Sequence, residues 1–320
     1  MADIIGLVLP FFGMIFLGAV AARITRQPVE ALGWMNTFII YVALPALFFQ
    51  LLSRTPIEQL TEWRYIFGSV LATYLVFGIM FVGSVIASRR EIAESTIKGL
   101  AAAYGNIGYM GPGLALLALG PEAAVPVALI FCFENIVHFA IAPTMMAIAG
   151  GEKAPPLVLA IGVVKRIVLH PFIIATAIGV LAAWARFEPP AAIDQLLAYL
   201  AQAAAPCALF VMGVTLALRP LKRVPREMGA IVALKLVVHP ILCYVVLSLI
   251  GNFSEAWMFS AVLLAALPTA TNVFVIAQQY DVWVQRASAS ILLTTVLSVV
   301  TVTGLLYLIK SGMLPPDLFP

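Results

Sequence analysis

Charged side chains are scarce in this chain, since only 10% of its 320 residues are Asp, Glu, Lys or Arg. Soluble domains carry about 25% charged residues, so a soluble globular fold is excluded. The chain is instead 63% apolar, with a mean hydropathy of +1.06. This composition indicates an integral membrane protein that crosses the lipid bilayer several times.

The signatures of several chemistries are also missing. The sequence has no phosphate-binding loop, no HExxH zinc motif, and neither the GxGD nor the GxSG motif of intramembrane proteases. Its three cysteines, Cys132, Cys207 and Cys243, lie in apolar stretches without metal-ligand spacing. No loop is long enough for a nucleic-acid module. We therefore expect no catalytic residue, no metal, no cofactor and no nucleic-acid partner.

Apolar stretches of the length that a membrane helix needs, about 20 residues, occur repeatedly along the chain. The sequence therefore predicts an all-α membrane fold with ten transmembrane helices. The predicted helices lie near residues 3–22, 34–52, 65–88, 97–119, 123–148, 167–184, 193–217, 228–250, 256–279 and 287–309.

Basic residues between these stretches are unevenly distributed. When alternate loops are grouped, one side of the membrane holds only Arg54, Arg64, Arg186 and Lys310, and the other side holds almost all the remaining Lys and Arg. Loops rich in Lys and Arg stay in the cytoplasm. We therefore expect a multi-pass protein of the cell (inner) membrane with both termini outside the cytoplasm.

The two halves of the chain share a pattern of prolines. A single offset aligns Pro10 with Pro171 and Pro45 with Pro206, and a polar turn at 149–156 separates the halves. Five helices per half is an odd number, so the second half is inverted relative to the first. Inverted repeats are typical of secondary transporters. The predicted repeats cover residues 1–160 and 161–320.

Two of the predicted helices contain residues that interrupt a helix, and the same offset aligns them. They read "YGNIGYMGPG" at 104–113 and "AALPTATNVF" at 265–274. Inside a membrane an unwound backbone is tolerated only where protein or a water-filled cavity satisfies it. We expect the breaks to face each other near the midplane, with second half-helices that start near Pro112 and Pro268 and attract anions at their N-termini. The alternative is a pair of kinks that serve packing only.

The breaks also carry polar side chains that suit an anionic ligand. The amides of Asn106 and Asn272 and the hydroxyls of Thr269 and Thr271 are hydrogen-bond donors. The predicted substrate site consists of Asn106, Gly108, Gly111, Pro112, Pro268, Thr269, Thr271 and Asn272.

Four ionisable residues lie within predicted helices, where such residues are costly and therefore functional candidates. Glu134 and His138 share one helix face, as do Lys235 and His239. Lys235 either extends to the interface, pairs with Glu134 or attracts an anionic substrate, and each histidine is a proton relay or a hydrogen-bonded core residue. His170, near the end of the sixth helix, ranks lower.

The membrane potential constrains what these groups do. An inside-negative membrane expels anions without a coupled ion, whereas import needs a coupled cation. Protonation of Glu134 is the available candidate, and sodium held by backbone carbonyls at the breaks stays open.

The runs "FIIYVALPALFF", "ALPTATNVFVIAQQYDV" and "ASASILLTTVLSVVT" resemble the auxin efflux carrier family of bacterial and plant transporters, and the resemblance covers essentially the whole chain. It implies a ten-helix fold like that of bile acid sodium symporters and a carboxylate bound where the broken helices cross. The family's crossover asparagines and proline correspond to Asn106, Asn272 and Pro268. The usual family order G-x-P is replaced by Gly111-Pro112-Gly113, which shifts the proline by one position, and whether this alters the first half-site stays open.

The resemblance also implies an elevator-like division of the chain. A fixed scaffold would cover about 1–55 and 161–220, and a mobile transport core about 63–150 and 226–310. We predict a carrier for a small organic anion, a mono- or dicarboxylate. A passive anion channel or a substrate receptor is the alternative, and an intramembrane enzyme is the least supported. The identity of the carboxylate, the direction of transport, the coupling ion and the oligomeric state, for which a homodimer is one option, stay open.

Overall fold

The structure is a computed structural model that describes residues 2–87, 91–150, 156–218 and 226–319. Within these ranges the chain is helical and contains no β-strand, apart from one isolated antiparallel bridge between Gly105 and Thr269. The predicted all-α class is therefore confirmed. Most of the predicted polar turn at 149–156 lies outside the described residues.

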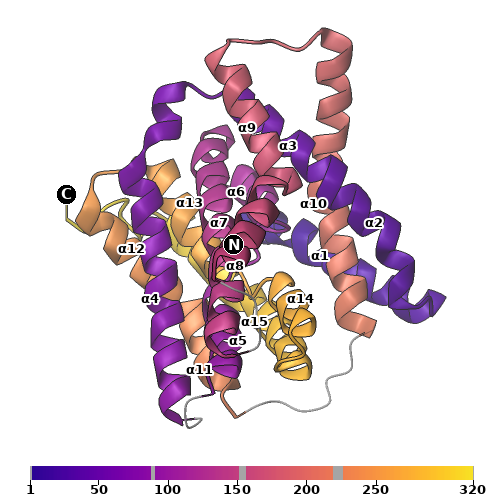
Figure 1. Cartoon of the computed structure of the whole chain (residues 1–320). Coiled ribbons are helices and arrows are strands. Elements are labelled where there is room, and N and C mark those ends of the chain that lie inside the picture. Colours follow the sequence, from indigo (N-terminus) through magenta and orange to yellow (C-terminus); the bar gives the residue numbers. More distant parts are fainter. Residues whose placement is uncertain (1, 88–90, 151–155, 219–225, 320) are drawn as a thin grey trace.

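The first half of the chain folds into long helices joined by short 3-10 or π turns (Figure 1). Helices dominate because a bilayer offers no water to backbone groups, so each segment must satisfy its own. The elements are α1 (Ala2–Thr25), η1 (Val29–Leu32), α2 (Gly33–Phe38), η2 (Ile39–Ala43), α3 (Leu44–Ser53), η3 (Ile57–Thr61), α4 (Trp63–Ala87), α5 (Ile92–Ala103), α6 (Gly111–Leu119), η4 (Pro121–Ala123) and α7 (Ala124–Ile148).

The second half differs from expectation at its first helix. The predicted helix at 167–184 begins only at Pro171, and a separate helix precedes it, because a proline inside a helix removes one backbone hydrogen bond and clashes with the preceding turn. His170 lies in the gap. The elements are α8 (Pro156–Val168), α9 (Pro171–Trp184), α10 (Ala191–Leu218), α11 (Met228–Ala233), η5 (Leu234–Val238), α12 (His239–Ile250), α13 (Glu255–Ala266), α14 (Asn272–Gln279) and α15 (Val284–Lys310).

Within the described ranges, six helical segments are long and apolar enough to cross a membrane. Each of the ten predicted stretches coincides with helical structure, but the two interrupted ones divide into halves too short to span alone. The helices thus identify a multi-pass membrane protein, and the count of ten spans stays a prediction. The six segments are Glu30–Ser53, Trp63–Ala87, Pro121–Ile148, Ala191–Leu218, Met228–Ile250 and Val284–Lys310.

The helices pack in two groups. In one group α1 lies against α10, and α3 lies against α9 and α10; in the other, α4 lies against α5 and α12, and α12 against α13. The α1–α10 contact depends on glycine, since a methyl group at Gly213 would lie 1.9 Å from the Ile15 carbonyl oxygen. Helix α7 contacts α3 of the first group and α4, α5 and α13 of the second. The Phe48 ring of α3 stacks on the Phe131 ring of α7 at 4.3 Å.

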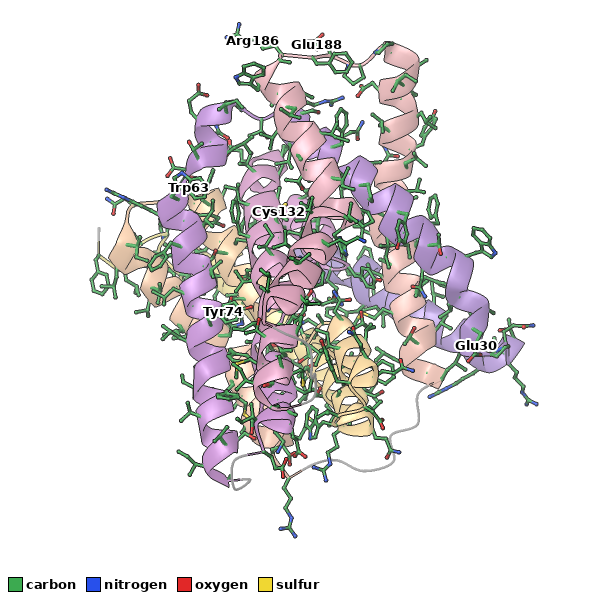
Figure 2. All side chains as sticks on the ribbon, viewed as in Figure 1. Glu30, Trp63, Tyr74, Cys132, Arg186 and Glu188 are labelled. Atoms are coloured by element: carbon green, nitrogen blue, oxygen red, sulfur yellow. The ribbon has the colours of Figure 1, made fainter. Side chains whose placement is uncertain are left out.

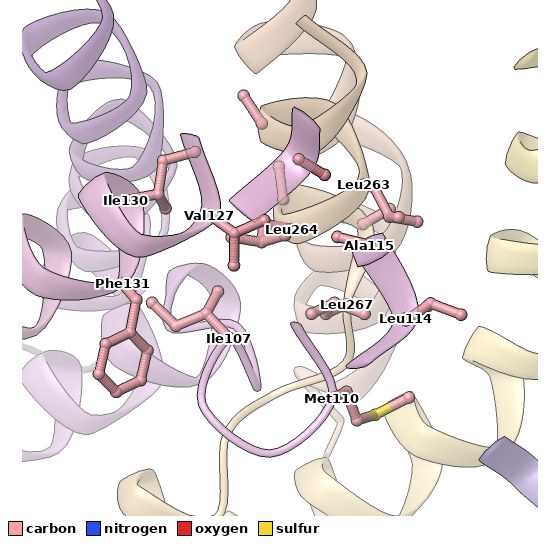
Figure 3. Packing of buried hydrophobic residues seen from close by; sticks show 14 of the residues in the cluster. Ile107, Met110, Leu114, Ala115, Val127, Ile130, Phe131, Leu263, Leu264 and Leu267 are labelled. Atoms are coloured by element: carbon pink, nitrogen blue, oxygen red, sulfur yellow. The ribbon is translucent and has the colours of Figure 1, made fainter. Parts of the chain in front are cut away.

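Figures 2 and 3 show how the side chains follow this arrangement. Trp63 and Arg186 lie toward one end of the molecule, and Glu30 lies toward the other (Figure 2). Between the two ends, α6, α7 and α13 bury a dense apolar cluster that includes Leu114 and Leu264 (Figure 3). One half of each interrupted helix, α6 of the first and α13 of the second, therefore packs into this cluster.

Candidate functional site: two crossing helix breaks

Both predicted interruptions are present. Helix α5 ends at Ala103 and α6 begins at Gly111, while α13 ends at Ala266 and α14 begins at Asn272. Between these ends the chain is not helical. In the interior of a membrane protein, such a segment needs partners for every backbone N–H and C=O.

The two breaks supply partners for each other. The backbone N–H of Asn106 donates to the Pro268 carbonyl at 2.8 Å, and the N–H of Ala270 donates to the Tyr104 carbonyl at 2.9 Å. The expectation that the breaks face each other is therefore met. A break that served packing alone would need backbone partners as well, so the pairing shows the crossing of the breaks and leaves their role to the side chains around it.

The half-helices begin differently from each other. Pro112 lies in the first turn of α6, as predicted. Helix α14 begins at Asn272, four residues after Pro268, near which the prediction placed its start. The reason for the offset is that the Pro268 carbonyl pairs with Asn106, and Leu267 before it is extended, with ψ 150°. The chain turns helical after this pairing ends.

A cavity of about 60 Å³ lies at the crossing and is called the crossover cavity here. Four of the predicted substrate residues line it, namely Asn106, Gly108, Thr271 and Asn272; the other four, Gly111, Pro112, Pro268 and Thr269, are not among its lining residues. Thr269 is buried, and its hydroxyl donates to the Ala101 carbonyl at 2.7 Å. The complete lining is Ile40, Tyr104, Gly105, Asn106, Gly108, Tyr109, Phe131, Asn135, His170, Ala270, Thr271 and Asn272.

The two asparagine side chains have different partners. The amide of Asn106 donates to the Met212 sulfur of α10 at 3.1 Å, and a thioether is a weak acceptor. The amide of Asn272 donates to the Tyr104 hydroxyl at 2.8 Å, which in turn donates to the Asn135 side-chain oxygen. Thus the cavity carries amide donors from both breaks, one loosely held and one in a network.

The crossover cavity borders a larger one. A larger cavity of about 680 Å³, called the vestibule here, shares the lining residues Ile40, His170 and Asn272 with it and also contacts Lys165. A recess of about 670 Å³ is lined by Arg54 and others. Among the described residues, this recess shares none with the crossover cavity.

Beside the crossing, four buried polar side chains form a continuous chain. The Thr73 hydroxyl donates to Glu134 Oε1 at 2.8 Å, and Thr73 Oγ1 lies 3.0 Å from His239 Nε2. His239 Nδ1 lies 2.9 Å from Lys235 Nζ. When Glu134 is ionised, the Thr73 hydroxyl donates its only proton to the carboxylate. His239 Nε2 must then donate to Thr73, and Nδ1 must accept from the lysine. All the hydrogen bonds therefore run in one direction, from Lys235 to Glu134.

This chain decides between the alternatives for Lys235. The side chain is fully buried, and its Nζ donates to the Ala265 carbonyl at 2.6 Å, so the alternative of extension to the membrane interface is wrong. The alternative of pairing with Glu134 is met only indirectly, through His239 and Thr73. The ammonium thus lies against the last turn of α13, directly before the second break.

His138 belongs to a second group of contacts. Its Nδ1 lies 2.7 Å from the Tyr74 hydroxyl, and its ring stacks on Tyr104 at 3.8 Å. Within the described part of the chain, His138 Nε2 is buried without a hydrogen-bond partner. His138 also lines the vestibule. Through its stacking on Tyr104 it is in contact with the network of Asn272.

Several residues of the site were not identified from the sequence. Tyr104 and Asn135 carried a signal, because Tyr104 opens the first break and Asn135 lies beside Glu134. His170 was ranked low, although it lines both cavities. Thr73 and Met212 gave no signal, since Thr and Met are ordinary residues of membrane helices.

Comparison with known proteins identifies the family of the chain. The family described as "Membrane transport protein" matches residues 3–306 of the chain. A "Putative malonate transporter" of Rhizobium meliloti is 65% identical over 320 residues, which is 100% of both chains. An "Uncharacterized transporter" of Methanothermobacter thermautotrophicus is 26% identical over 301 residues, 92% of this chain and 94% of the other.

A further relative, "Uncharacterized transporter YfdV" of Escherichia coli K12, is 24% identical over 303 residues, 93% of this chain and 95% of that protein. The family and the names of its members indicate a transporter rather than an enzyme. The resemblance that the sequence motifs indicated is thereby confirmed.

Proposed function

Because the chain belongs to the membrane transport protein family, we propose that it is a secondary transporter of a small carboxylate, with malonate as the first candidate. The carrying observation is the mutual pairing of two helix breaks around a cavity lined by amide side chains from both. Transporters of this architecture bind substrate where interrupted helices meet. The name of the 65% identical relative supports malonate.

In this proposal a carboxylate accepts hydrogen bonds from Asn106 and Asn272 and lies near the N-terminus of α6. Aligned backbone dipoles there favour negative charge. The weak contact between Asn106 and the Met212 sulfur is readily exchanged for a bond to a charged oxygen. The substrate site thus needs little rearrangement beyond this exchange.

Transport follows an elevator-like alternating-access cycle in this proposal. Helices α4–α7 and α11–α15 form the mobile core, and α1–α3 with α8–α10 form the scaffold, as two inverted five-helix repeats with ten spans. The contacts that cross between them include two ring pairs, Phe48 with Phe131 and Phe139 with His170, and two bonds to sulfur, Asn106 with Met212 and Cys132 with Thr176. Hydrogen bonds to sulfur are weak, so a sliding movement exchanges them at little cost. The vestibule, which contacts Lys165 of the Lys- and Arg-rich side, represents the cytoplasm-open state.

The Lys235–His239–Thr73–Glu134 chain gives the core a place for a coupling proton. With Glu134 ionised, all four groups are satisfied in one direction. A proton on Glu134 removes the negative end of this chain, so the lysine that braces the second break loses part of its compensation. Glu134 is therefore the proposed proton carrier, with His239 as the relay.

The proposal is tested with purified protein in liposomes. A carrier exchanges internal unlabelled malonate for external labelled malonate, saturates with concentration, and is accelerated by substrate on the opposite side. A channel gives unsaturated flux without this acceleration. A thermal-shift screen of small mono- and dicarboxylates ranks the substrates. Absence of both exchange and stabilisation with every carboxylate would contradict the proposed function.

The orientation in the cell membrane is tested separately. Single cysteines that replace Glu188 and Arg226 in a cysteine-free background should react with membrane-impermeant maleimide from opposite sides, with residue 226 cytoplasmic. This result would place the Lys- and Arg-rich loops in the cytoplasm, as the proposed orientation requires. Labelling of both positions from one side would show that α10 does not cross the membrane.

A further inference from the structure

His170 lies at the boundary between the two cavities. It lies in the short gap between α8 and α9, and it lines both the crossover cavity and the vestibule. Its imidazole contacts the ring of Phe139 on α7 at a centroid distance of 4.9 Å. Pro171 directly after it fixes the backbone at the start of α9. The imidazole thus packs against Phe139 at the boundary between the two cavities, and its backbone is followed by the restricted proline.

The charge distribution around the crossover cavity is uneven. Among the described residues that line it, His170 is the only one whose side chain can carry a positive charge. The donors of the two breaks are neutral amides and a hydroxyl. The ammonium of Lys235 is not among the groups that line the cavity: it lies behind Gly105, where a methyl group would be 3.3 Å from Nζ, and it is bound to the Ala265 carbonyl and close to His239. Neutral amides can hold one carboxylate, but a second negative charge in a poorly solvated cavity needs a charged or strong donor.

We propose that His170 is the specificity-determining residue of this site, and that it binds the second carboxylate of a short dicarboxylate whose first carboxylate is held by Asn106 and Asn272. The inference rests on the proposed function and names its substrate class. The size of the cavity, about 60 Å³, selects a short chain between the carboxylates. Longer dicarboxylates place their second group in the vestibule, beyond His170.

This arrangement also ties binding to movement. The asparagines lie on the helix breaks, whereas His170 lies between α8 and α9, the helices proposed as part of the scaffold. A bound dicarboxylate therefore bridges the mobile core and the fixed scaffold, and a monocarboxylate does not. Lys165 in the vestibule adds a long-range attraction that acts on any anion in proportion to its charge.

The test compares two ligands of the same skeleton, malonate and its monomethyl ester, in equilibrium binding to the purified full-length protein near neutral pH. The wild type should bind malonate at least tenfold more tightly than the ester. His170→Leu should weaken malonate binding about ten- to a hundredfold, the range expected for one hydrogen bond to a charged group, and should change ester binding less than threefold. His170→Gln, which keeps a donor, should recover part of the loss.

Two controls separate recognition from packing. Phe139→Leu removes the ring against His170 but keeps the imidazole, so it should leave most of the preference for malonate. Lys165→Gln should lower the binding of both ligands, with a factor for the dianion malonate of about the square of the factor for the monoanionic ester, because the lost attraction scales with charge. A loss of malonate binding beyond that square is the signature expected of His170→Leu alone. Monodisperse elution and an unchanged melting temperature verify that each variant is folded.

The outcomes are distinguishable. Equal weakening of both ligands by His170→Leu, or no weakening of either, would overturn the assignment of His170, and so would a wild type that binds the two ligands equally. All three results would leave carboxylate transport intact. Failure of the wild type to bind any carboxylate would instead contradict the proposed function.

Discussion

The two helix breaks occupy corresponding places in the chain but are built differently. The first spans residues 104–110, contains two glycines and ends where Pro112 enters the first turn of α6. The second spans residues 267–271, contains no glycine and passes into α14 at Asn272. Glycine at 108 leaves room for Phe131, since a methyl group there would lie 2.9 Å from that ring. The first break is thus shaped by close packing and the second by polar contacts.

Their side-chain anchors differ as well. The amide of Asn106 is held by a thioether on α10, across the contact between the two helix groups. The amide of Asn272 belongs to a network with Tyr104 and Asn135 inside one group. The second half-site is therefore preorganised, whereas in the proposed transport cycle the first would change as α10 moves relative to the breaks. The difference suggests that the second break sets affinity and the first senses conformation.

The largest expected effect comes from removing the brace of the second break. Lys235→Met leaves the Ala265 carbonyl and His239 Nδ1 buried without their donor. Each such group costs about 1–3 kcal/mol, so unfolding should become easier by about 2–6 kcal/mol. Unfolding in detergent measures this. Arg54→Met is the control, because its ion pair with Asp194 is exposed and such pairs contribute about 0–1 kcal/mol. Equal stability of the two variants would show that Lys235 braces nothing.

The next effect compares the asparagines directly. A hydrogen bond to a charged partner contributes about 1.5–3 kcal/mol, so Asn272→Ala should weaken carboxylate binding about ten- to a hundredfold, and Asn106→Ala somewhat less. Asp at either position should be worse than Ala, because a fixed negative charge repels the anion across a poorly screened gap.

Affinity measured by titration, with folding checked by elution, separates this view from a packing role. If the asparagines only capped half-helices, Asp would substitute well, since Asp caps as effectively as Asn. Wild-type affinity in both Asp variants would exclude the crossover cavity as the substrate site.

These contrasts also mark how far the sequence alone could reach. Hydropathy and the positions of glycine and proline predicted the helices and both breaks, because membrane helices and their interruptions are local properties of composition. The start of α14 was located only approximately, since it depends on the pairing of Pro268 with Asn106, a contact between residues far apart in the chain. Periodicity cannot reveal such a contact.

The polar network shows the same limit. Glu134, His138, Lys235 and His239 stood out because charge is rare in a membrane helix. Their connection through Thr73 was not visible, since a lone threonine in an apolar helix usually bonds to its own backbone. His170 was ranked low because its position depends on how α8 and α9 lie against the crossover, which no sequence spacing encodes.

A smaller effect is expected from Glu134, which accepts the last hydrogen bond of the chain that starts at Lys235. Glu134→Gln keeps the shape of the side chain but cannot take up a proton. If Glu134 carries the coupling proton, the variant should lose the pH dependence of net uptake while malonate exchange continues at about the wild-type rate. Flux measured over a range of external pH tests this. A pH profile identical to the wild type would make Glu134 a structural residue.

The smallest effect tests whether the first break is loosely held. Met212→Leu keeps the volume of the side chain and removes the sulfur that accepts from Asn106. In the unbound protein the amide then lacks even a weak acceptor, whereas in the bound protein it is satisfied by the carboxylate. Removal of a weak bond of about 0.5–1 kcal/mol from the unbound state alone should tighten malonate binding about two- to fivefold. Titration of Met212→Leu measures this, and the same substitution combined with Asn106→Ala should show no tightening, because the donor is gone. Weaker binding in Met212→Leu would mean that the sulfur positions Asn106 for the substrate, and the contrast between a loose first half-site and a preorganised second one would then be wrong.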